Sequence, residues 1–291
     1  MISPPFQRRV IVLGASCLSL LALLVLVRSL SVTVPSPSDS DLLAVLQGRS
    51  PYLGPPRDSP RPPAAPAWHS PLASACARLD PGLIRRLARL ARQFPQRIRS
   101  IPTDPSNYAL RQRVDAFGNQ LDPRPRVVVL HETVYGIDSA INTFITHHSR
   151  DEDQVSYHTL IGLDGQVVQV LDPRFRAFGA GNSAFQGEWA ITNPQVGGSI
   201  NNFALHLSLE TPLDGENEAA GHSGYSQAQY DAAALVLAGW VRHFGIPWQR
   251  ITTHRHVDLG GERADPRSFD WKALQTRLVA LGVIDCRTLK R

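Results

Sequence analysis

Cysteine is scarce in this chain of 291 residues, which contains three. None of them forms a C-x-x-C pair, so the sequence lacks a cysteine-based structural metal site and a dithiol redox motif. Cys17 lies in an apolar run near the N-terminus, whereas Cys76 and Cys286 lie at the two ends of the region that is patterned like a folded domain. In an exported protein this isolated pair is a candidate disulfide that would tie the ends of the domain together, and two free thiols are the alternative.

Long runs of Lys or Arg are also absent, although the formal net charge is +5. Much of the excess comes from R-R-L-A-R-L-A-R-Q-F at residues 85–94, whose spacing favours the solvated face of an amphipathic helix. No nucleic-acid recognition motif accompanies the charge, so we expect no nucleic-acid partner. An anionic polymer such as a cell-wall glycan is compatible with the basic balance.

Two common catalytic signatures are missing as well. The sequence contains no G-x-S-x-G motif and no Cys/His nucleophile arrangement. The glycines of G-A-G-N-S at residues 179–183 are followed by neither a lysine nor a helix start, which a phosphate-binding loop would require. The sequence therefore gives no support to a serine or cysteine nucleophile or to a phosphate loop.

An apolar run without a charged residue extends from Val10 to Val27, between Arg9 and Arg28. Eighteen residues in a helix would span about 27 Å, close to the roughly 30 Å hydrocarbon core of a bilayer. The only small-residue pattern behind it is Ser29-Leu30-Ser31, a poor match to a cleavage site, so an uncleaved anchor is favoured over a cleaved signal. Because two arginines precede the run and one follows it, residues 1–33 are predicted to be a cytoplasmic stub and a membrane anchor, with the body exported.

Proline, serine and arginine dominate residues 34–75, as in P-S-P-S-D-S and G-P-P-R-D-S-P-R-P-P-A-A-P-A. Such a composition buries too little apolar surface to fold and favours an extended, polyproline-like chain. We therefore expect a disordered linker over residues 34–75 and one folded domain over residues 76–291.

Extended and helical patterns alternate in the folded region. Val127–Leu130 is a continuous apolar run typical of a buried central strand, and Phe203–Glu210 is a further strand. Two strands flank the turn at Asp164-Gly165, which is a strong hairpin signal. Ser226 is suited to cap a helix that runs to about Phe244. Further helices are expected from Asp80, over Asp138–Thr146 and over Phe269–Leu281. The sequence predicts the α/β class, with a mixed central β-sheet flanked by helices in a single domain.

Three side chains form a candidate metal-ligand set. His131 ends the first buried strand, His254 follows the extended segment R-I-T-T, and Asp265 lies in a Gly-rich loop that can fold back toward His254. Two imidazoles and one carboxylate are what a catalytic zinc ion takes from a protein, with one position left open for water. His256 competes as a ligand because, in a strand, it would share a face with His254. The set predicts metal-assisted hydrolysis.

From Pro125 to Leu281 the chain resembles the zinc-dependent N-acetylmuramoyl-L-alanine amidases, the type 2 amidase family that includes the animal peptidoglycan-recognition proteins. The resemblance is carried, in order, by V-V-V-L-H-E-T, S-Y-H-T-L-I-G-L-D-G-Q-V-V-Q, A-F-G-A-G-N-S-A-F-Q-G, N-N-F-A-L-H-L-S-L-E, A-Q-Y, I-T-T-H and D-P-R-S-F-D-W. It implies a Zn²⁺ cofactor and hydrolysis of the amide between N-acetylmuramic acid and L-alanine in peptidoglycan. We expect the protein to be a monomer.

Two alternative functions stay open beside the amidase reaction, and the apolar N-terminal run leaves two possible locations. Some relatives are non-hydrolytic peptidoglycan-binding proteins that have lost a metal ligand, whereas Asp265 completes the set here. Hydrolysis of another acylated amide is a further alternative. With the predicted anchor, we expect the catalytic domain in the periplasm, tethered to the inner membrane, or secreted if the segment is cleaved.

The remaining machinery departs from the family pattern. Where relatives carry a glutamate in the strand I-G-I-E-L, this chain has Ser208, and Glu210 and His206 share the face of Ser208. We predict Glu210 as the general base, with His206 as the alternative and a structural role at the sheet edge as the competing interpretation of Glu210. Arg263 takes the position of a basic residue that would stabilise the oxyanion, or it forms a salt bridge within its loop.

Substrate contacts are predicted for Ser208, Asn182 and His158, although a packing role is the competing interpretation of His158. His222, Ser223 and Tyr225 in G-H-S-G-Y could line a substrate groove or form a simple loop. Gly179 stands where many relatives have the histidine of A-W-H-A-G, so one polar contact to the substrate is missing.

Overall fold

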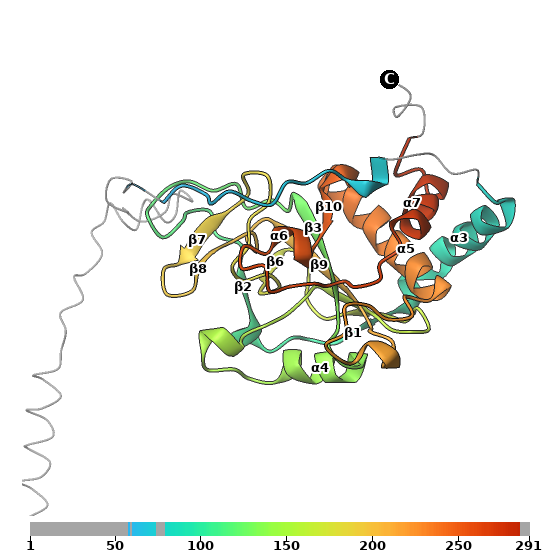
Figure 1. Ribbon diagram of the computed structural model, residues 1–291, viewed down its shortest axis with the longest axis horizontal. Helices are drawn as coiled ribbons and strands as arrows, with labels where there is room; N and C mark the ends of the chain where they lie inside the picture. The colour runs from blue at the N-terminus through green and yellow to red at the C-terminus, as the bar shows by residue number, and fades with distance from the viewer. Residues whose placement is uncertain (1–57, 59, 74–78, 286–291) are drawn as a thin grey trace, which may run out of the picture. The chain divides into compact units, whose positions relative to one another are not determined.

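The computed structural model describes residue 58 and residues 60–73 and 79–285, which belong to one compact unit of residues 55–291 (Figure 1). The predicted anchor, Cys17, the candidate disulfide of Cys76 with Cys286 and most of the predicted linker lie outside the described residues. Within the described part of the chain, no helix has the length and the apolar character that a bilayer crossing requires.

The centre of the unit is a six-stranded mixed sheet with the strand order β1-β5-β4-β9-β3-β10. Every neighbouring pair is parallel except β4 and β5, which form the predicted hairpin around Asp164-Gly165. In chain order the strands are β1 (Ile98–Ser100), β3 (Val127–Glu132), β4 (Thr159–Ile161), β5 (Val167–Gln169), β9 (Ala204–Leu209) and β10 (Ile251–Thr253). The predicted fold class, a mixed sheet flanked by helices, is confirmed.

Strands β3 and β9 are buried along their whole length, which explains their nearly continuous apolar sequences. Their register places His131 of β3 opposite Ser208 of β9. The polar side chains of these strands are His131 and Glu132 at the carboxyl end of β3 and His206 and Ser208 of β9. In sheets of this kind the carboxyl ends of parallel strands are where ligands bind.

Helices cover both faces of the sheet (Figure 1). On one face, Leu130 and Leu207 pack with Leu237 of α5 and Leu278 of α7. On the other face, Phe144 of α4 packs with strand residues that include Leu160. The helices are α3 (Pro81–Gln93), α4 (Ile137–Ile145), α5 (Gln227–Phe244), α6 (His254–Val257) and α7 (Trp271–Ala280).

Two predicted helix starts are confirmed by their caps. The Asp80 carboxylate accepts the backbone N–H groups of Gly82 and Leu83 at the start of α3. Ser226 and Gln229 form a reciprocal capping box at the start of α5. At the other end of α5, Gly245 has a φ of 67°, a left-handed conformation that glycine adopts without strain.

Short elements complete the unit. Two-stranded ribbons are formed by β2 (Tyr108–Leu110) with β6 (Phe175–Ala177) and by β7 (Ala190–Asn193) with β8 (Gly197–Ser199). Single 3₁₀ turns are η1 (Pro71–Ala73), η2 (Phe94–Arg97), η3 (Pro105–Asn107), η4 (Asp151–Asp153), η5 (Leu213–Gly215) and η6 (Trp248–Arg250).

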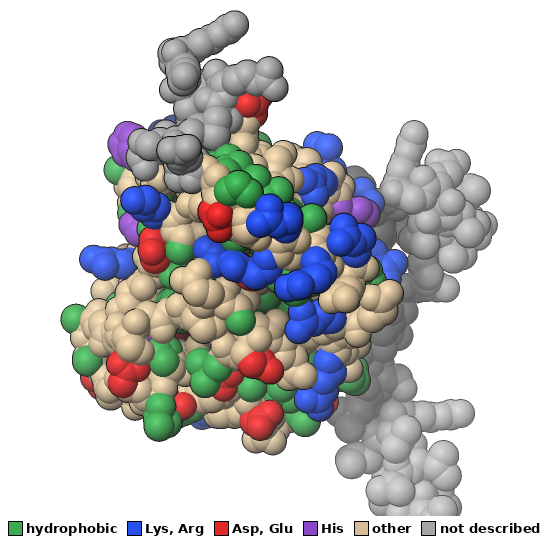
Figure 2. Space-filling model, turned by 90° about the vertical axis from the view of Figure 1, so that its right-hand side faces the viewer, with side chains coloured by type: hydrophobic (Ala, Val, Ile, Leu, Met, Phe, Trp, Pro, Cys, Tyr) green, Lys and Arg blue, Asp and Glu red, His purple; other side chains and the backbone are tan. Residues whose placement is uncertain are grey.

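The arginine-rich helix α3 has the predicted amphipathic character. Leu83 and Leu87 are buried, whereas Arg85, Arg89 and Arg92 are exposed. Figure 2 shows the face of the molecule on which α3 lies, where basic side chains gather. The arginines of this stretch therefore lie mainly in solvent, as the sequence predicts.

The packed region begins before residue 76, the boundary expected from composition. Leu72 is fully buried in the main core. The Trp68 ring lies 6.0 Å from the ring centres of Phe185 and Trp271, and its indole N–H donates to the carbonyl of Gln249 at 2.9 Å. Residues 68–72 of the expected linker are therefore part of the folded unit.

Candidate metal centre

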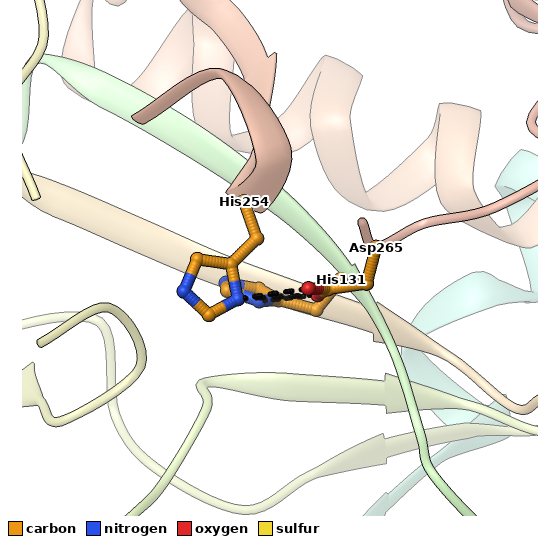
Figure 3. A group of neighbouring side chains, drawn as sticks. All are labelled: His131, His254 and Asp265. Carbon is orange, nitrogen blue, oxygen red and sulfur yellow. Dashed lines mark hydrogen bonds and ion pairs between the residues drawn. The ribbon is translucent and has the colours of Figure 1, made fainter. Parts of the chain in front are cut away.

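The three predicted ligands converge at the carboxyl ends of β3 and β10 (Figure 3). The Nδ1 atom of His131 lies 3.2 Å from Oδ2 of Asp265, and Nδ1 of His254 lies 3.0 Å from Oδ1 of the same carboxylate. One donor atom from each residue lies within 4.8 Å of the other two. Pairing of β10 with β3 brings the two histidines together, because Thr253, which precedes His254, lies opposite Leu130, which precedes His131.

Backbone hydrogen bonds fold the Asp265 loop back, as predicted. The N–H of Arg255 donates to the carbonyl of Asp265 at 3.1 Å. The Asp258 carboxylate accepts the N–H groups of Glu262 and Arg263 at 2.7 and 2.8 Å. These contacts fix the approach of Asp265 to the start of α6.

The protonation states of the site suit metal binding. Burial lowers the pKa of His131 to about 4, although the contact with Asp265 opposes this shift. Burial also opposes ionisation of Asp265, but hydrogen bonds from His131 and His254 hold the pKa of its carboxyl group below the usual range. At neutral pH the set therefore includes a neutral imidazole and a carboxylate, which are ligand forms. Two nitrogen donors and one oxygen donor at this spacing fit a zinc ion.

His256 is not part of this set. The prediction that it shares a face with His254 assumed a strand, but α6 begins at His254, so two residues of helix turn the side chains apart. Its Nδ1 lies 2.6 Å from the Thr253 hydroxyl, and its ring packs edge-on against Trp68 at 4.9 Å. The aromatic contact ties the segment before residue 73 to α6.

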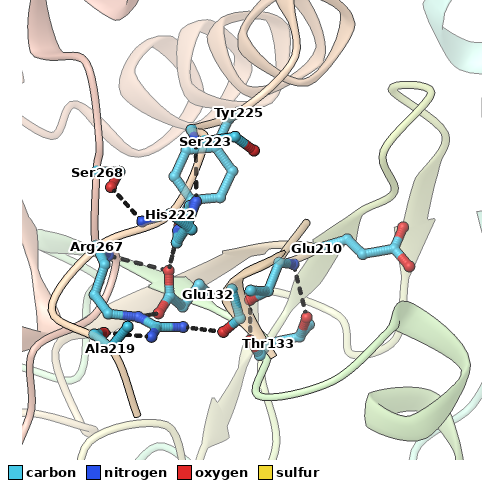
Figure 4. Close-up of polar contacts among 12 residues, drawn as sticks. Glu132, Thr133, Glu210, Ala219, His222, Ser223, Tyr225, Arg267 and Ser268 are labelled. Carbon is cyan, nitrogen blue, oxygen red and sulfur yellow. Dashed lines mark hydrogen bonds and ion pairs between the residues drawn. The ribbon is translucent and has the colours of Figure 1, made fainter. Parts of the chain in front are cut away.

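The predicted base Glu210 lies at the amino end of α4. One carboxylate oxygen accepts the backbone N–H of Ile137 at 2.9 Å, and the other accepts that of Leu163 at 2.8 Å. Figure 4 shows this carboxylate pointing away from Glu132 and Thr133 of the neighbouring strand. Both oxygens thus have structural partners, as the competing interpretation of Glu210 expected.

Ser208 and His206 lie beside His131 on β9, and both are fully buried. The Ser208 hydroxyl has no hydrogen-bond partner among the described residues. The Nδ1 of His206 lies 3.0 Å from Nε2 of His131. Burial, reinforced by the neighbouring histidines His131 and His158, holds the pKa of His206 well below its usual value.

His158 has a packing role, which was the alternative to substrate contact. It is fully buried, its Nδ1 accepts the backbone N–H of His206 at 2.9 Å, and its Nε2 lies 3.2 Å from the carbonyl of Phe175. Burial lowers its pKa to about 3. The burial and the two hydrogen bonds of His158 favour the packing interpretation over the predicted substrate contact.

Arg263 and Asn182, two of the predicted site residues, are exposed to solvent. The Arg263 side chain is exposed and has no ion pair among residues 79–285. Burial is the main cause of the lowered pKa of His131, and the positive charge of Arg263 lowers this pKa slightly further. Asn182 is exposed too, and its carbonyl accepts the N–H of Leu259 at 3.0 Å, which joins its loop to the Asp265 loop. Both remain predictions for substrate and oxyanion contact.

The sequence did not predict the set of contacts around the Glu132 carboxylate, which we call the Glu132 clamp (Figure 4). Glu132 is the residue that follows His131 in β3. The Glu132 carboxylate accepts the Tyr225 hydroxyl at 2.5 Å, His222 Nε2 at 3.0 Å and the backbone N–H of Arg267 at 3.0 Å, and it pairs with the Arg267 guanidinium. The side chain of His222 is fully buried. His222 and Tyr225 therefore hold Glu132 and do not line a groove. The glutamate that follows His131 in V-L-H-E-T could have indicated these contacts, because a buried acidic side chain at a strand end needs hydrogen-bond or ion-pair partners.

Tyr157 was also missed. Its ring stacks on that of His131 with a centre separation of 4.3 Å and an interplanar angle of 20°. Together with Phe144, which meets Tyr157 edge-on at 5.4 Å, it forms an aromatic wall against the first ligand. The wall restricts rotation of the His131 ring.

The sequence around these residues is similar to that of known amidases. A family model described as N-acetylmuramoyl-L-alanine amidase matches residues 121–268. The 1,6-anhydro-N-acetylmuramyl-L-alanine amidase AmpD of Citrobacter freundii is 30% identical over 119 residues, which are 40% of this chain and 54% of that protein. The chain thus spans about half the length of this curated relative.

Solved structures of the same group are similar in part. A crystal structure of an AmpD derivative is 24% identical with a TM-score of 0.47, over 62% of this chain and 94% of that one. The amidase AmiD from E. coli, solved with anhydro-N-acetylmuramic acid-L-Ala-D-γ-Glu-L-Lys, is 19% identical with a TM-score of 0.42, over 59% and 65% of the two chains. Since the family model covers half of the sequence and includes all three ligand positions, the chain belongs to the N-acetylmuramoyl-L-alanine amidase family.

Proposed function

We propose that this chain is a zinc-dependent amidase that hydrolyses the bond between N-acetylmuramic acid and L-alanine in peptidoglycan. The observation that carries the proposal is the convergence of His131, His254 and Asp265 within 4.8 Å at the carboxyl ends of two parallel strands. Family membership and the activities of the amidase relatives support the substrate class.

The ligand residues would hold the zinc ion through two imidazole nitrogens and one carboxylate. When bound, zinc lowers the pKa of a water molecule and polarises a carbonyl group. The chain's own residues keep the ligands in place: the ring of Tyr157 packs on His131, and hydrogen bonds to Asp258 shape the loop of Asp265.

Arg263 is proposed to stabilise the negative charge that develops on the attacked carbonyl oxygen. Its guanidinium is exposed, lacks an ion pair among the described residues and is close enough to act on the pKa of His131. A fixed positive charge at such a position is a large contributor to acyl-transfer catalysis. Asn182, exposed on the adjoining loop, is proposed to contact the substrate.

Neither of the two predicted general bases has the surroundings that this role requires. Glu210 uses both oxygens to bind backbone N–H groups, and His206 is fully buried behind His131. We assign neither as general base, and we expect slower turnover than in family members that have a glutamate at the position of Ser208.

Non-hydrolytic recognition of peptidoglycan is the alternative function, but an intact ligand set would be superfluous in a pure binder. We further propose that the enzyme works in the cell envelope, tethered by the apolar run of residues 10–27. The folded unit would then act on cell-wall material outside the inner membrane.

The test is hydrolysis of purified muropeptides by residues 55–291, because this fragment retains the packed Trp68 and Leu72. We expect mass spectrometry to detect free stem peptide with zinc, and none after chelation. His131→Ala serves as the matched inactive control. A zinc-loaded wild-type sample that releases no stem peptide would refute the proposed reaction.

A further inference from the structure

A second imidazole lies directly behind the first metal ligand. The Nδ1 atom of His131 faces Asp265, and the opposite nitrogen, Nε2, lies 3.0 Å from Nδ1 of His206. Both rings are fully buried, and their planes are inclined by 37°. His206 therefore contacts the ligand but is out of reach of a substrate.

The hydrogen bond between the two rings has a required direction when a metal is held. A neutral imidazole carries one N–H, so His131 can offer the lone pair of Nδ1 only if its proton is on Nε2. That N–H then needs an acceptor, and Nδ1 of His206 is the atom within reach. Partners of this kind fix the tautomer and the ring orientation of metal-binding histidines.

The same arrangement leaves the far nitrogen of His206 unpaired. Nε2 of His206 is buried and has no hydrogen-bond partner among the described residues. An unpaired buried polar atom costs free energy, so a histidine at this position is not explained by stability. Its contact with His131 is the feature that accounts for it.

Space for His206 exists because residue 179 is glycine. A Cβ atom added at Gly179 would lie 2.4 Å from Nδ1 of His206 and 2.6 Å from its Cγ, well inside contact distance. From the other side, the ring of His158 lies parallel to that of His206 within 3°, at 5.8 Å, and accepts its backbone N–H. The ring of His206 is therefore confined between His158 and the backbone of Gly179.

We propose that His206 is a positioning residue of the metal centre, which accepts the Nε2–H of His131 and so directs the Nδ1 lone pair toward the metal. Gly179 provides the space that this contact requires. The inference rests on the proposed zinc site and adds a residue pair that controls metal affinity.

The test measures the dissociation constant of zinc by competition with a chromophoric chelator, on residues 55–291. We expect His206→Ala and Gly179→Ala to weaken zinc binding by roughly 10- to 100-fold. His206→Asn should remain within about fivefold of the wild type, because its amide oxygen can occupy the place of Nδ1. Gly181→Ala is the matched control: a Cβ there meets no atom within 4 Å, and zinc binding should be unchanged.

A second measurement does not depend on folding of the variants. In the zinc-loaded wild type, nitrogen-proton correlation NMR should show His131 protonated at Nε2. Protonation at Nδ1, or a folded His206→Ala variant with wild-type zinc affinity, would overturn the inference. Failure of this inference can be told apart from failure of the proposed amidase activity. Wild-type protein that binds zinc but cleaves no muropeptide refutes the proposed activity alone. Wild-type protein that binds no zinc refutes both the activity and the positioning role of His206.

Discussion

Ser208 lies opposite His131 in the register of β9 against β3, with its hydroxyl buried and unpaired among the described residues. The family resemblance implies a glutamate at this position, so we expect proton transfer to be the slow part of the reaction in this chain. This pair of residues therefore offers a direct test of how the proposed reaction depends on a carboxylate beside the candidate ligands.

Ser208→Glu is expected to raise the turnover of muropeptides by at least tenfold, because a carboxylate would then lie beside the ligands as a general base. The measurement is kcat on a defined muropeptide with zinc in excess. Ser208→Gln, of similar size but without a basic group, is the control. Equal rates for the two variants would show that this position does not limit proton transfer.

Glu210→Gln is expected to lower the free energy of unfolding by about 1–3 kcal/mol and to leave zinc affinity unchanged. A glutamine can accept only one of the two backbone N–H groups, from Ile137 and Leu163, that the carboxylate binds. Urea unfolding and zinc competition on the same sample check this expectation. A variant with full stability and no turnover would restore Glu210 as the base.

Asp265→Asn should weaken zinc binding by more than a hundredfold and abolish muropeptide hydrolysis. The amide is uncharged, and it replaces the carboxylate that both His131 and His254 contact. Equilibrium dialysis followed by metal analysis measures the loss. Asp122→Asn, which changes a carboxylate paired with Arg124 and without a contact to either histidine, should retain zinc at the wild-type level.

Stability of the metal-free protein should fall as the pH drops below about 6.5. The pKa of His131 is lowered to about 4 and that of His158 to about 3, so the unfolded chain binds more protons than the folded one below the ordinary histidine pKa. The contribution is fully present above pH 6.5 and is lost progressively toward pH 4. Urea unfolding at pH 7.5, 6 and 5 tests this, and a constant midpoint would contradict it.

The ligand set was predictable because His131 ends the apolar run of β3, His254 directly follows β10, and Asp265 lies in a loop with clear turn residues. His131 lies near the end of β3 and His254 directly follows β10, so the parallel pairing of these two strands brings them together. Alternation along β9 correctly put His206 and Ser208 on one face.

The residues whose structural setting differs from the sequence expectation lie where a strand ends. Glu210 follows the last residue of β9, and its side chain turns to the start of α4. His256 lies in α6, a helix that begins directly after β10. Likewise, the partners of Glu132 come from residues 222–267, far along the chain, and no local pattern indicates such contacts.

The Glu132 clamp has a mechanical consequence for the metal centre. Glu132 adjoins His131 in sequence, Arg267 follows Asp265 by two residues, and the Arg267 guanidinium also binds the carbonyl groups of Asn217 and Ala219. One ion pair thus limits how far two ligands can separate and, at the same time, anchors the loop of residues 217–219. Metal binding and the order of that distant loop should rise and fall together, so the loop can report on zinc occupancy without contacting the ion.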